Sequence, residues 1–239
     1  MNDTNTASHP GQGNIVPTVL AALVFLAAGP VSADVEDDDI FTFFKTEKLE
    51  YQRDNKDSYF VWDAEGWIGD DKNKLWLKTE GEYVLDVTQT ERAELQVLYS
   101  RLITDFWDAQ VGIRDEFQPN QTLDAVLGVQ GLAPYWFEVD AALFLSQDAD
   151  VLARIKASYE FLFSQKLILQ PQIELNFAAQ DVSKRDYKRG LSELEAGLRL
   201  RYEIIREVAP YVGLEYVRDE AAESDKNSLR FVTGVKIWF

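Results

Sequence analysis

The sequence of 239 residues contains no cysteine, one histidine, His9, and one methionine, Met1. A chain without cysteine forms no disulfide bond, which is compatible with export but does not establish it. Acidic residues outnumber basic ones by 41 to 24, the formal net charge is −17, and no basic cluster is present. Because a protein that binds phosphate backbones needs a basic face, we expect no nucleic-acid partner.

Long apolar runs are also scarce. The mean hydropathy is −0.25 and 27% of the residues are charged, which argues against a bundle of membrane helices of about 20 apolar residues each. The one apolar run, residues 15–28, is followed by the small residues Val31, Ser32 and Ala33. We interpret residues 1–33 as a secretory signal peptide, although residues 1–14 lack the usual Lys or Arg. Residues 34–44 then form an acidic lead-in that we expect to be disordered.

Apolar residues do occur at alternating positions, most clearly at the C-terminus. Counting back from Phe239, every second residue is Ile237, Val235, Thr233, Phe231 and Leu229. Because the last residues of soluble domains usually fray, this strand favours an outer-membrane barrel, whose final strand closes the sheet. Within it, Phe231, Val235, Ile237 and Phe239 resemble the C-terminal assembly signal of such barrels. The alternative is the last strand of a soluble β-sandwich.

Similar alternation recurs in segments of about ten residues from residue 49 onwards and gives twelve candidate strands. The opposite parity is rich in charges, and aromatic residues stand near the ends of the apolar faces, as in a lipid-facing wall. The two longest connections, 181–190 and 218–228, fall on the same side of the predicted sheet. We therefore predict that residues 45–239 form an all-β fold, a single antiparallel transmembrane β-barrel of bacterial outer-membrane type.

The predicted lumen carries eight carboxylates that are candidates for a cation route or a metal-binding surface. They are Asp63, Glu65, Glu80, Glu82, Asp108, Glu138, Asp140 and Glu174. Carboxylate rings favour cations in pores. The alternative is a structural network in which these acids pair with inward Lys78, Arg114, Arg154, Arg199 and Arg201 and fill the interior. Weaker metal candidates are Asp37, Asp38 and Asp39 in the lead-in, although such runs are more often solvated.

Catalysis is not expected from this chain. Residues 34–239 contain neither histidine nor cysteine, so the common nucleophilic and general-base arrangements cannot form. A carboxylate pair could in principle hydrolyse a substrate, but a lumen full of carboxylates gives no pair a special status. We predict that the protein is not an enzyme and uses no organic cofactor.

Six segments carry a resemblance to a known family. They read WDAEGW (62–67), NKLWLKTEGE (73–82), LGVQGLAPYWFEVD (127–140), LILQP (167–171), GLRLRYEI (197–204) and APYVG (209–213). These segments are similar to the copper-resistance protein B (CopB) family, from about residue 45 to the C-terminus. The resemblance implies an outer-membrane protein that supports copper tolerance and is described as copper-binding. The implied partners are outer-membrane lipid, the barrel-assembly machinery and periplasmic copper-handling proteins.

The sequence departs from this family in one respect. Many members carry a Met- and His-rich stretch before the barrel, whereas residues 34–39 here are mostly acidic and residues 34–239 lack Met, His and Cys. Soft copper ligands are therefore missing from this part of the chain. We predict that lumenal carboxylates carry any contact with copper ions that the barrel binds or moves across the membrane. The alternatives are a non-specific channel for cations or polar solutes and a structural barrel that scaffolds a partner.

Overall fold

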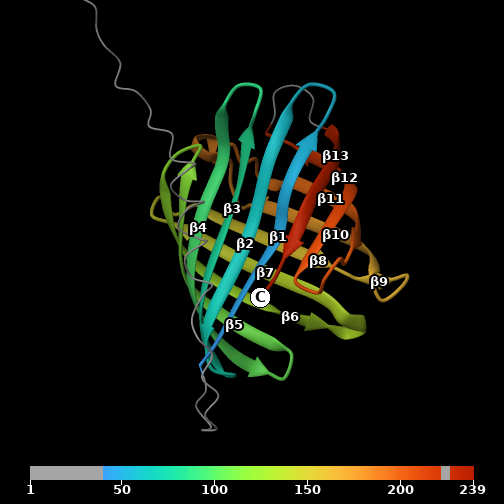
Figure 1. The fold of residues 1–239 in the computed structure, drawn as a ribbon. Coiled ribbons are helices and arrows are strands. Elements are labelled where there is room, and N and C mark those ends of the chain that lie inside the picture. Colours follow the sequence, from blue (N-terminus) through green and yellow to red (C-terminus); the bar gives the residue numbers. More distant parts are fainter. Residues whose placement is uncertain (1–39, 222–226) are drawn as a thin grey trace, which may run out of the picture. The chain divides into compact units, whose positions relative to one another are not determined.

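The computed structural model describes residues 40–221 and 227–239, which form one antiparallel sheet (Figure 1). Its strands are β1 (Phe41–Arg53), β2 (Ser58–Gly69), β3 (Asn73–Val84), β4 (Gln89–Thr104), β5 (Trp107–Gln118), β6 (Thr122–Ala133), β7 (Phe137–Ser146), β8 (Val151–Ser158), β9 (Phe161–Leu162), β10 (Leu167–Ala178), β11 (Gly190–Tyr202), β12 (Val208–Asp219) and β13 (Asn227–Ile237). In these described ranges, no helix is long and apolar enough to cross a membrane. The expected signal peptide and Asp37, Asp38 and Asp39 lie outside them.

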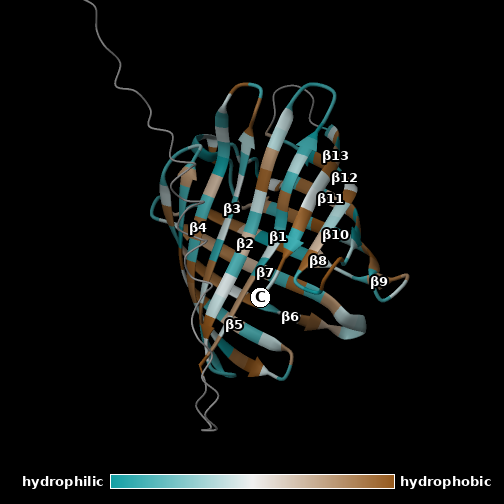
Figure 2. Ribbon diagram, viewed as in Figure 1, coloured by the Kyte–Doolittle hydropathy of each residue, from teal (hydrophilic) through white to brown (hydrophobic). Residues whose placement is uncertain are grey.

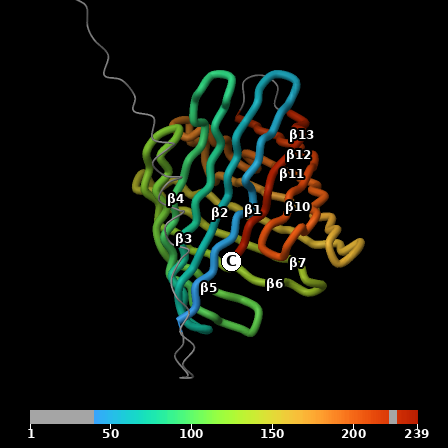
Figure 3. The backbone as a smooth tube through the Cα atoms, viewed as in Figure 1, coloured from blue at the N-terminus to red at the C-terminus, as the bar shows by residue number. Residues whose placement is uncertain are grey.

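The sheet closes on itself because its first and last strands pair. β1 and β13 are antiparallel, with Glu50 opposite Gly234, and Figure 3 shows the two strands side by side. Further along this seam, the backbone N–H of Phe239 donates to the carbonyl of Phe44 at 2.9 Å, and the N–H of Phe44 donates back at 3.1 Å. Within the described residues, twelve strands close the ring, as predicted, and the two-residue β9 pairs with β10 beside it.

The first strand begins before the boundary that the sequence suggested. β1 starts at Phe41, so residues 41–44, which we assigned to the lead-in, pair with β2. The register between β1 and β2 shifts between Thr46 and Lys48. Such a bulge moves the alternation by one residue, which explains why the period-two pattern is weak at this end of the chain.

The two faces of the sheet differ as expected for a barrel in lipid. Apolar side chains face outwards, and Leu127, Leu143 and Phe231 are 61%, 54% and 54% exposed. Charged side chains face inwards and are buried, including Glu50 and Arg114 at 0% exposure. Figure 2 shows the resulting alternation of hydrophobic and hydrophilic residues along the strands. A soluble sandwich would bury the apolar face instead, so the arrangement is that of a membrane barrel.

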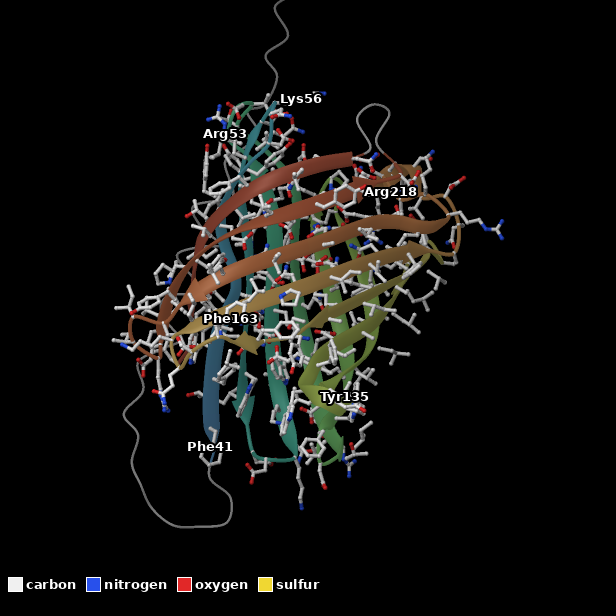
Figure 4. All side chains as sticks on the ribbon, turned by 90° about the vertical axis from the view of Figure 1, so that its right-hand side faces the viewer. Phe41, Arg53, Lys56, Tyr135, Phe163 and Arg218 are labelled. Atoms are coloured by element: carbon white, nitrogen blue, oxygen red, sulfur yellow. The ribbon has the colours of Figure 1, made fainter. Side chains whose placement is uncertain are left out.

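The two ends of the barrel differ in the length of their connections. We call the end with the connections after β1, β3, β5, β7, β10 and β12 the loop end, and the opposite end the turn end. The longest connection, 179–189, lies at the loop end, as predicted, and so does the connection from β12 to β13. Residues 159–166, which include β9, join β8 to β10 at the turn end. In Figure 4, Arg53, Lys56 and Arg218 lie near the loop end, whereas Phe41 and Tyr135 lie at the turn end. β1 begins and β13 ends at the turn end.

Candidate metal-binding vestibule in the lumen

A cavity of about 310 Å³ lies inside the barrel, and we call it the vestibule. Six of the eight predicted carboxylates line it, and they come from β2, β3, β7 and β10. These six are Asp63, Glu65, Glu80, Glu138, Asp140 and Glu174. They gather because side chains two residues apart on a strand share one face, and closure of the sheet turns that face inwards.

The other two predicted carboxylates lie outside the vestibule lining. Glu82 forms an ion pair with Arg230 at 2.9 Å, and Asp108 forms one with Lys74 at 3.2 Å. Both point into the lumen, as the strand parity predicted, but at different heights from the main group. Their positions make them useful comparators for any property assigned to the vestibule.

The ammonium group of Lys156 is surrounded by three of the predicted carboxylates. Its Nζ lies 2.8 Å from Asp63, 2.5 Å from Glu80 and 3.7 Å from Glu174. Lys156 stands on β8, whereas its partners stand on β2, β3 and β10, so the contacts with β2 and β3 cross the lumen. Carboxylates are common ligands of hard cations, and at this position they surround a cation that the chain itself supplies.

A second ammonium group, that of Lys78, has a similar oxygen environment. Its Nζ lies 2.6 Å from Asp140 and 3.8 Å from Glu65, and it donates to the amide oxygens of Gln130 at 3.1 Å and Gln110 at 3.2 Å. The vestibule therefore holds two positions at which a lysine of the chain supplies the cation. Asp140 is still 27% exposed at its side chain, so water reaches this wall.

Glu138 differs from the other five vestibule carboxylates. The hydroxyl of Ser158 donates to it at 3.5 Å, and among the described residues it takes part in no ion pair within 4.0 Å. The side chain is exposed and stands near the start of β7 at the turn end. It is thus the vestibule carboxylate most free to meet an ion that arrives from that end.

Some vestibule residues were missed at the level of sequence. Lys45 and Glu47 line the cavity together with Lys48, because the β1 bulge turns this stretch inwards, and a bulge leaves no clear signal in the sequence. Glu94, at the inner end, is fully buried. The apolar residues of 93–99 stand at odd positions and face outwards. Glu94 stands at an even position, and this alternation could have identified it as a lumenal residue.

Buried ion pairs close the end of the vestibule that lies farthest from the turn end. Arg154 Nη1 lies 3.1 Å from Glu80 and 2.8 Å from Glu94, and its guanidinium lies 5.4 Å from the ring centre of Phe144. Arg114 pairs with Glu94 at 3.3 Å. The inward arginines are therefore engaged with acids, which supports the structural-network interpretation for much of the lumen.

The described residues contain no group of three or more His, Cys, Asp or Glu side chains placed to hold a metal ion. The vestibule carboxylates are separated by the lysines between them, and five of the six are in ion pairs. Their oxygen donors suit hard or borderline divalent ions, not Cu(I), which prefers thiolate and thioether ligands. Any metal ion would have to replace a lysine ammonium group.

The closed sheet, its exposed apolar wall and its charged lumen define a β-barrel of the outer-membrane class. Among solved structures, the chain is similar to the NanC porin in its rhombohedral crystal form, with a TM-score of 0.55 and 12% sequence identity. That match covers 82% of this chain and 99% of the porin chain. At this identity it establishes the fold alone.

Residues 40–239 match the family model described as copper resistance protein B precursor (CopB). The chain is 39% identical to copper resistance protein B of Escherichia coli over 202 residues, which are 81% of this chain and 68% of that protein. It is 40% identical to the copper resistance protein B homolog of Pseudomonas syringae pv. tomato over 215 residues, covering 86% and 72%. The chain belongs to the copper resistance protein B family. It is a protein of the bacterial outer membrane, and its apolar wall contacts lipid.

Proposed function

We propose that this barrel contributes to copper resistance by binding Cu(II) ions in the vestibule through carboxylate oxygens. Its family supports the role in copper resistance. The observation that carries the binding mode is that Lys156 Nζ lies among Asp63, Glu80 and Glu174 on one water-accessible cavity. Residues 34–239 supply no thiolate, thioether or imidazole, so oxygen ligands are the ones available for this metal.

A preference for copper does not require soft ligands. Divalent first-row ions bind a given oxygen or nitrogen site in the order that peaks at Cu(II), so carboxylates hold Cu(II) more tightly than Zn(II). In the vestibule, a Cu(II) ion has to displace the ammonium group of Lys156, which lowers its apparent affinity. We therefore expect weak, selective binding, suited to collecting copper at high concentration and releasing it again.

The test is metal binding by residues 34–239, refolded in detergent and titrated separately with Cu(II), Zn(II) and Cu(I). This range excludes Met1 and His9, which would otherwise offer ligands of their own. We expect saturable binding of Cu(II) that exceeds binding of Zn(II), and no tight binding of Cu(I). The double variant Asp63→Asn, Glu174→Gln should weaken Cu(II) binding by at least tenfold. Lys156→Gln should strengthen it, because the competing ammonium group is gone.

Asp108→Asn is the matched control, since Asp108 is also a lumenal carboxylate paired with a lysine but does not line the vestibule. It should leave the affinity for Cu(II) unchanged. Equal effects of Asp108→Asn and of the double variant would show non-specific attraction to an acidic lumen. Unchanged binding after replacement of Glu65, Glu80, Glu138 and Asp140 by Ala would reject the vestibule as the binding site.

Two partner classes accompany this proposal. The vestibule reaches the turn end, where Glu138 is exposed, and barrels with an even number of strands place both chain ends on the periplasmic side. Periplasmic copper-handling proteins would therefore meet the vestibule directly, and the barrel-assembly machinery would meet the final strand. Passage of copper across the barrel is a further form of the proposal, and it requires the loop end of the lumen to open. That the protein is not an enzyme stays a prediction.

A further inference from the structure

The connection between β10 and β11, residues 179–189, turns inwards at the loop end instead of extending into solvent. Val182 and Tyr187 within it are 5% and 8% exposed. The two residues form a small hairpin, in which the N–H of Val182 donates to the carbonyl of Tyr187 at 2.9 Å and the N–H of Tyr187 donates back at 3.2 Å. A loop in a barrel is normally a surface feature, so its burial calls for a structural reason.

Arg185 supplies that reason, because it anchors the tip of the segment in the barrel wall. Its Nη1 and Nη2 donate to the two carboxylate oxygens of Asp124 on β6, at 3.0 and 2.9 Å. Nη2 also forms an ion pair with Glu116 on β5. The Arg185 side chain is only 2% exposed. A forked contact of this kind is strong and directional.

The segment completes an apolar cluster inside the lumen. Val182 and Tyr187 pack with inward residues that include Val126, Phe144 and Leu152. Phe144 also lines the vestibule and lies 3.6 Å from the guanidinium of Arg114. One layer of side chains therefore separates the vestibule from the segment, and the segment covers that layer from the loop end.

The attachment of this segment to the barrel differs from that of the strands. Apart from Arg185, its contacts at the rim include Gln180 donating to the carbonyl of Ala149 at 3.2 Å and Asn120 donating to the carbonyl of Lys184 at 2.5 Å. No strand ladder joins residues 180–189 to a neighbouring strand in the described sheet. At its C-terminal side, the segment ends at Gly190, which pairs with Ala178 of β10 and has a φ of 94°, a conformation that glycine adopts without steric cost.

We propose that residues 179–189 are a hinged plug, pinned by Arg185, that closes the loop end of the lumen and opens it when Arg185 leaves Asp124 and Glu116. Withdrawal leaves Glu116 without its ion pair, whereas Asp124 stays paired with Arg114. The opened path therefore gains one negative charge, and the open state passes cations in preference to anions. The plug acts on any small ion and does not depend on copper binding in the vestibule. Failure of one proposal therefore leaves the other standing.

The test is ion conductance of the purified barrel in planar lipid bilayers. Wild type should show low conductance with rare openings, and Arg185→Ala should raise the open probability at least tenfold with selectivity for K⁺ over Cl⁻. Arg185→Lys keeps the charge but loses the forked contact, so it should fall between the two. Lys184→Ala is the matched control, because Lys184 is the adjacent residue of the plug and its ion pair with Asp148 is exposed on both sides.

A covalent lock tests the same proposal from the other direction. The chain contains no cysteine, so a protein with Asp148→Cys and Lys184→Cys carries only the two intended thiols, at positions whose side chains contact each other. Joining them with a short thiol crosslinker should abolish the openings that Arg185→Lys produces. Wild-type conductance in folded Arg185→Ala or Arg185→Lys, or openings that persist after crosslinking, would overturn the plug.

Discussion

At the scale of single residues, the lumen is stabilised by buried charges that depend on one another. Glu50 is fully buried and accepts from Arg199 Nε at 2.5 Å and from the hydroxyl of Tyr211 at 2.9 Å. Glu50→Ala leaves Arg199 with one remaining acidic partner, Glu215. Removing one member of a buried pair costs about 3–5 kcal/mol, and urea unfolding of the barrel in lipid vesicles should show a loss of that size.

Lys184→Ala provides the comparison for that measurement. The Lys184 and Asp148 side chains are 79% and 64% exposed, and an exposed ion pair contributes about 0–1 kcal/mol. We expect this variant to unfold at nearly the wild-type urea concentration. A similar loss in both variants would mean that the buried network adds no special stability.

One turn residue makes stability depend on pH. Asp70 Oδ1 accepts from the backbone N–H groups of Asn73 and Lys72, each at 2.6 Å, and these donors hold the pKa of Asp70 below its ordinary value. A lowered folded-state pKa stabilises the folded state above the unfolded pKa of about 3.9, and the contribution is lost as pH falls through the folded value. The difference in unfolding free energy between wild type and Asp70→Ala should therefore shrink below about pH 3.9.

The neighbouring variant Lys72→Ala keeps the Asp70 carboxylate and its backbone donors. Because these backbone donors are the main cause of the lowered pKa of Asp70, Lys72→Ala should keep most of the pH dependence that Asp70→Ala removes. A constant difference between wild type and Asp70→Ala from pH 7 to acid would contradict the assignment of the turn's stability to the ionised carboxylate.

At the scale of elements, neighbouring strands approach most closely at particular glycines. A Cβ built on Gly112 of β5 would lie 2.0 Å from the carbonyl oxygen of Val97 and 2.8 Å from the Cα of Leu98, both on β4. Backbone atoms cannot rotate away as a side chain can, so Gly112→Ala forces the strands apart and should cost about 1–3 kcal/mol. The matched change is Gly128→Ala on β6, where the nearest atom would lie at 3.2 Å. Equal unfolding midpoints for the two variants would contradict this.

The strands were predictable from sequence where one side of each faces lipid and the other faces the lumen. From β2 onwards, the period-two pattern located the strands and placed six carboxylates on one cavity. The β1 bulge was not predictable, because the shift between Thr46 and Lys48 depends on the pairing with β2. The burial of 179–189 was also hidden, since Arg185 reaches Asp124 over 61 positions in the sequence. Contacts between distant residues leave no periodic trace.

At the scale of the whole molecule, the lumen of the barrel is open at the turn end, through the vestibule, and closed at the loop end. The vestibule extends from the turn end, near Glu138, to the layer of Arg154 and Phe144, and the segment carrying Arg185 covers this layer. An ion can therefore enter from the turn end without crossing the membrane. This arrangement suits capture of an ion on one side better than continuous conduction.

We predict that assembly of the whole barrel depends on the terminal residue, Phe239. Its backbone pairs with Phe44, whereas its side chain is 63% exposed, so the ring itself adds little to the finished fold. If the ring serves as an assembly signal, Phe239→Ala should lower the fraction of barrel that reaches the outer membrane severalfold but leave refolding into lipid vesicles unchanged. Both quantities can be measured by the mobility difference between heated and unheated samples in gel electrophoresis.

Phe106→Ala is the matched change, because Phe106 also lies at the turn end and is 58% exposed. It should affect neither assembly in cells nor refolding in vesicles. If Phe239→Ala instead slowed both processes alike, the ring would be needed for closing β1 against β13 and not for recognition by the assembly machinery. Normal assembly of Phe239→Ala in cells would reject the signal at this residue and leave Phe231, Val235 and Ile237 on the same strand as its remaining carriers.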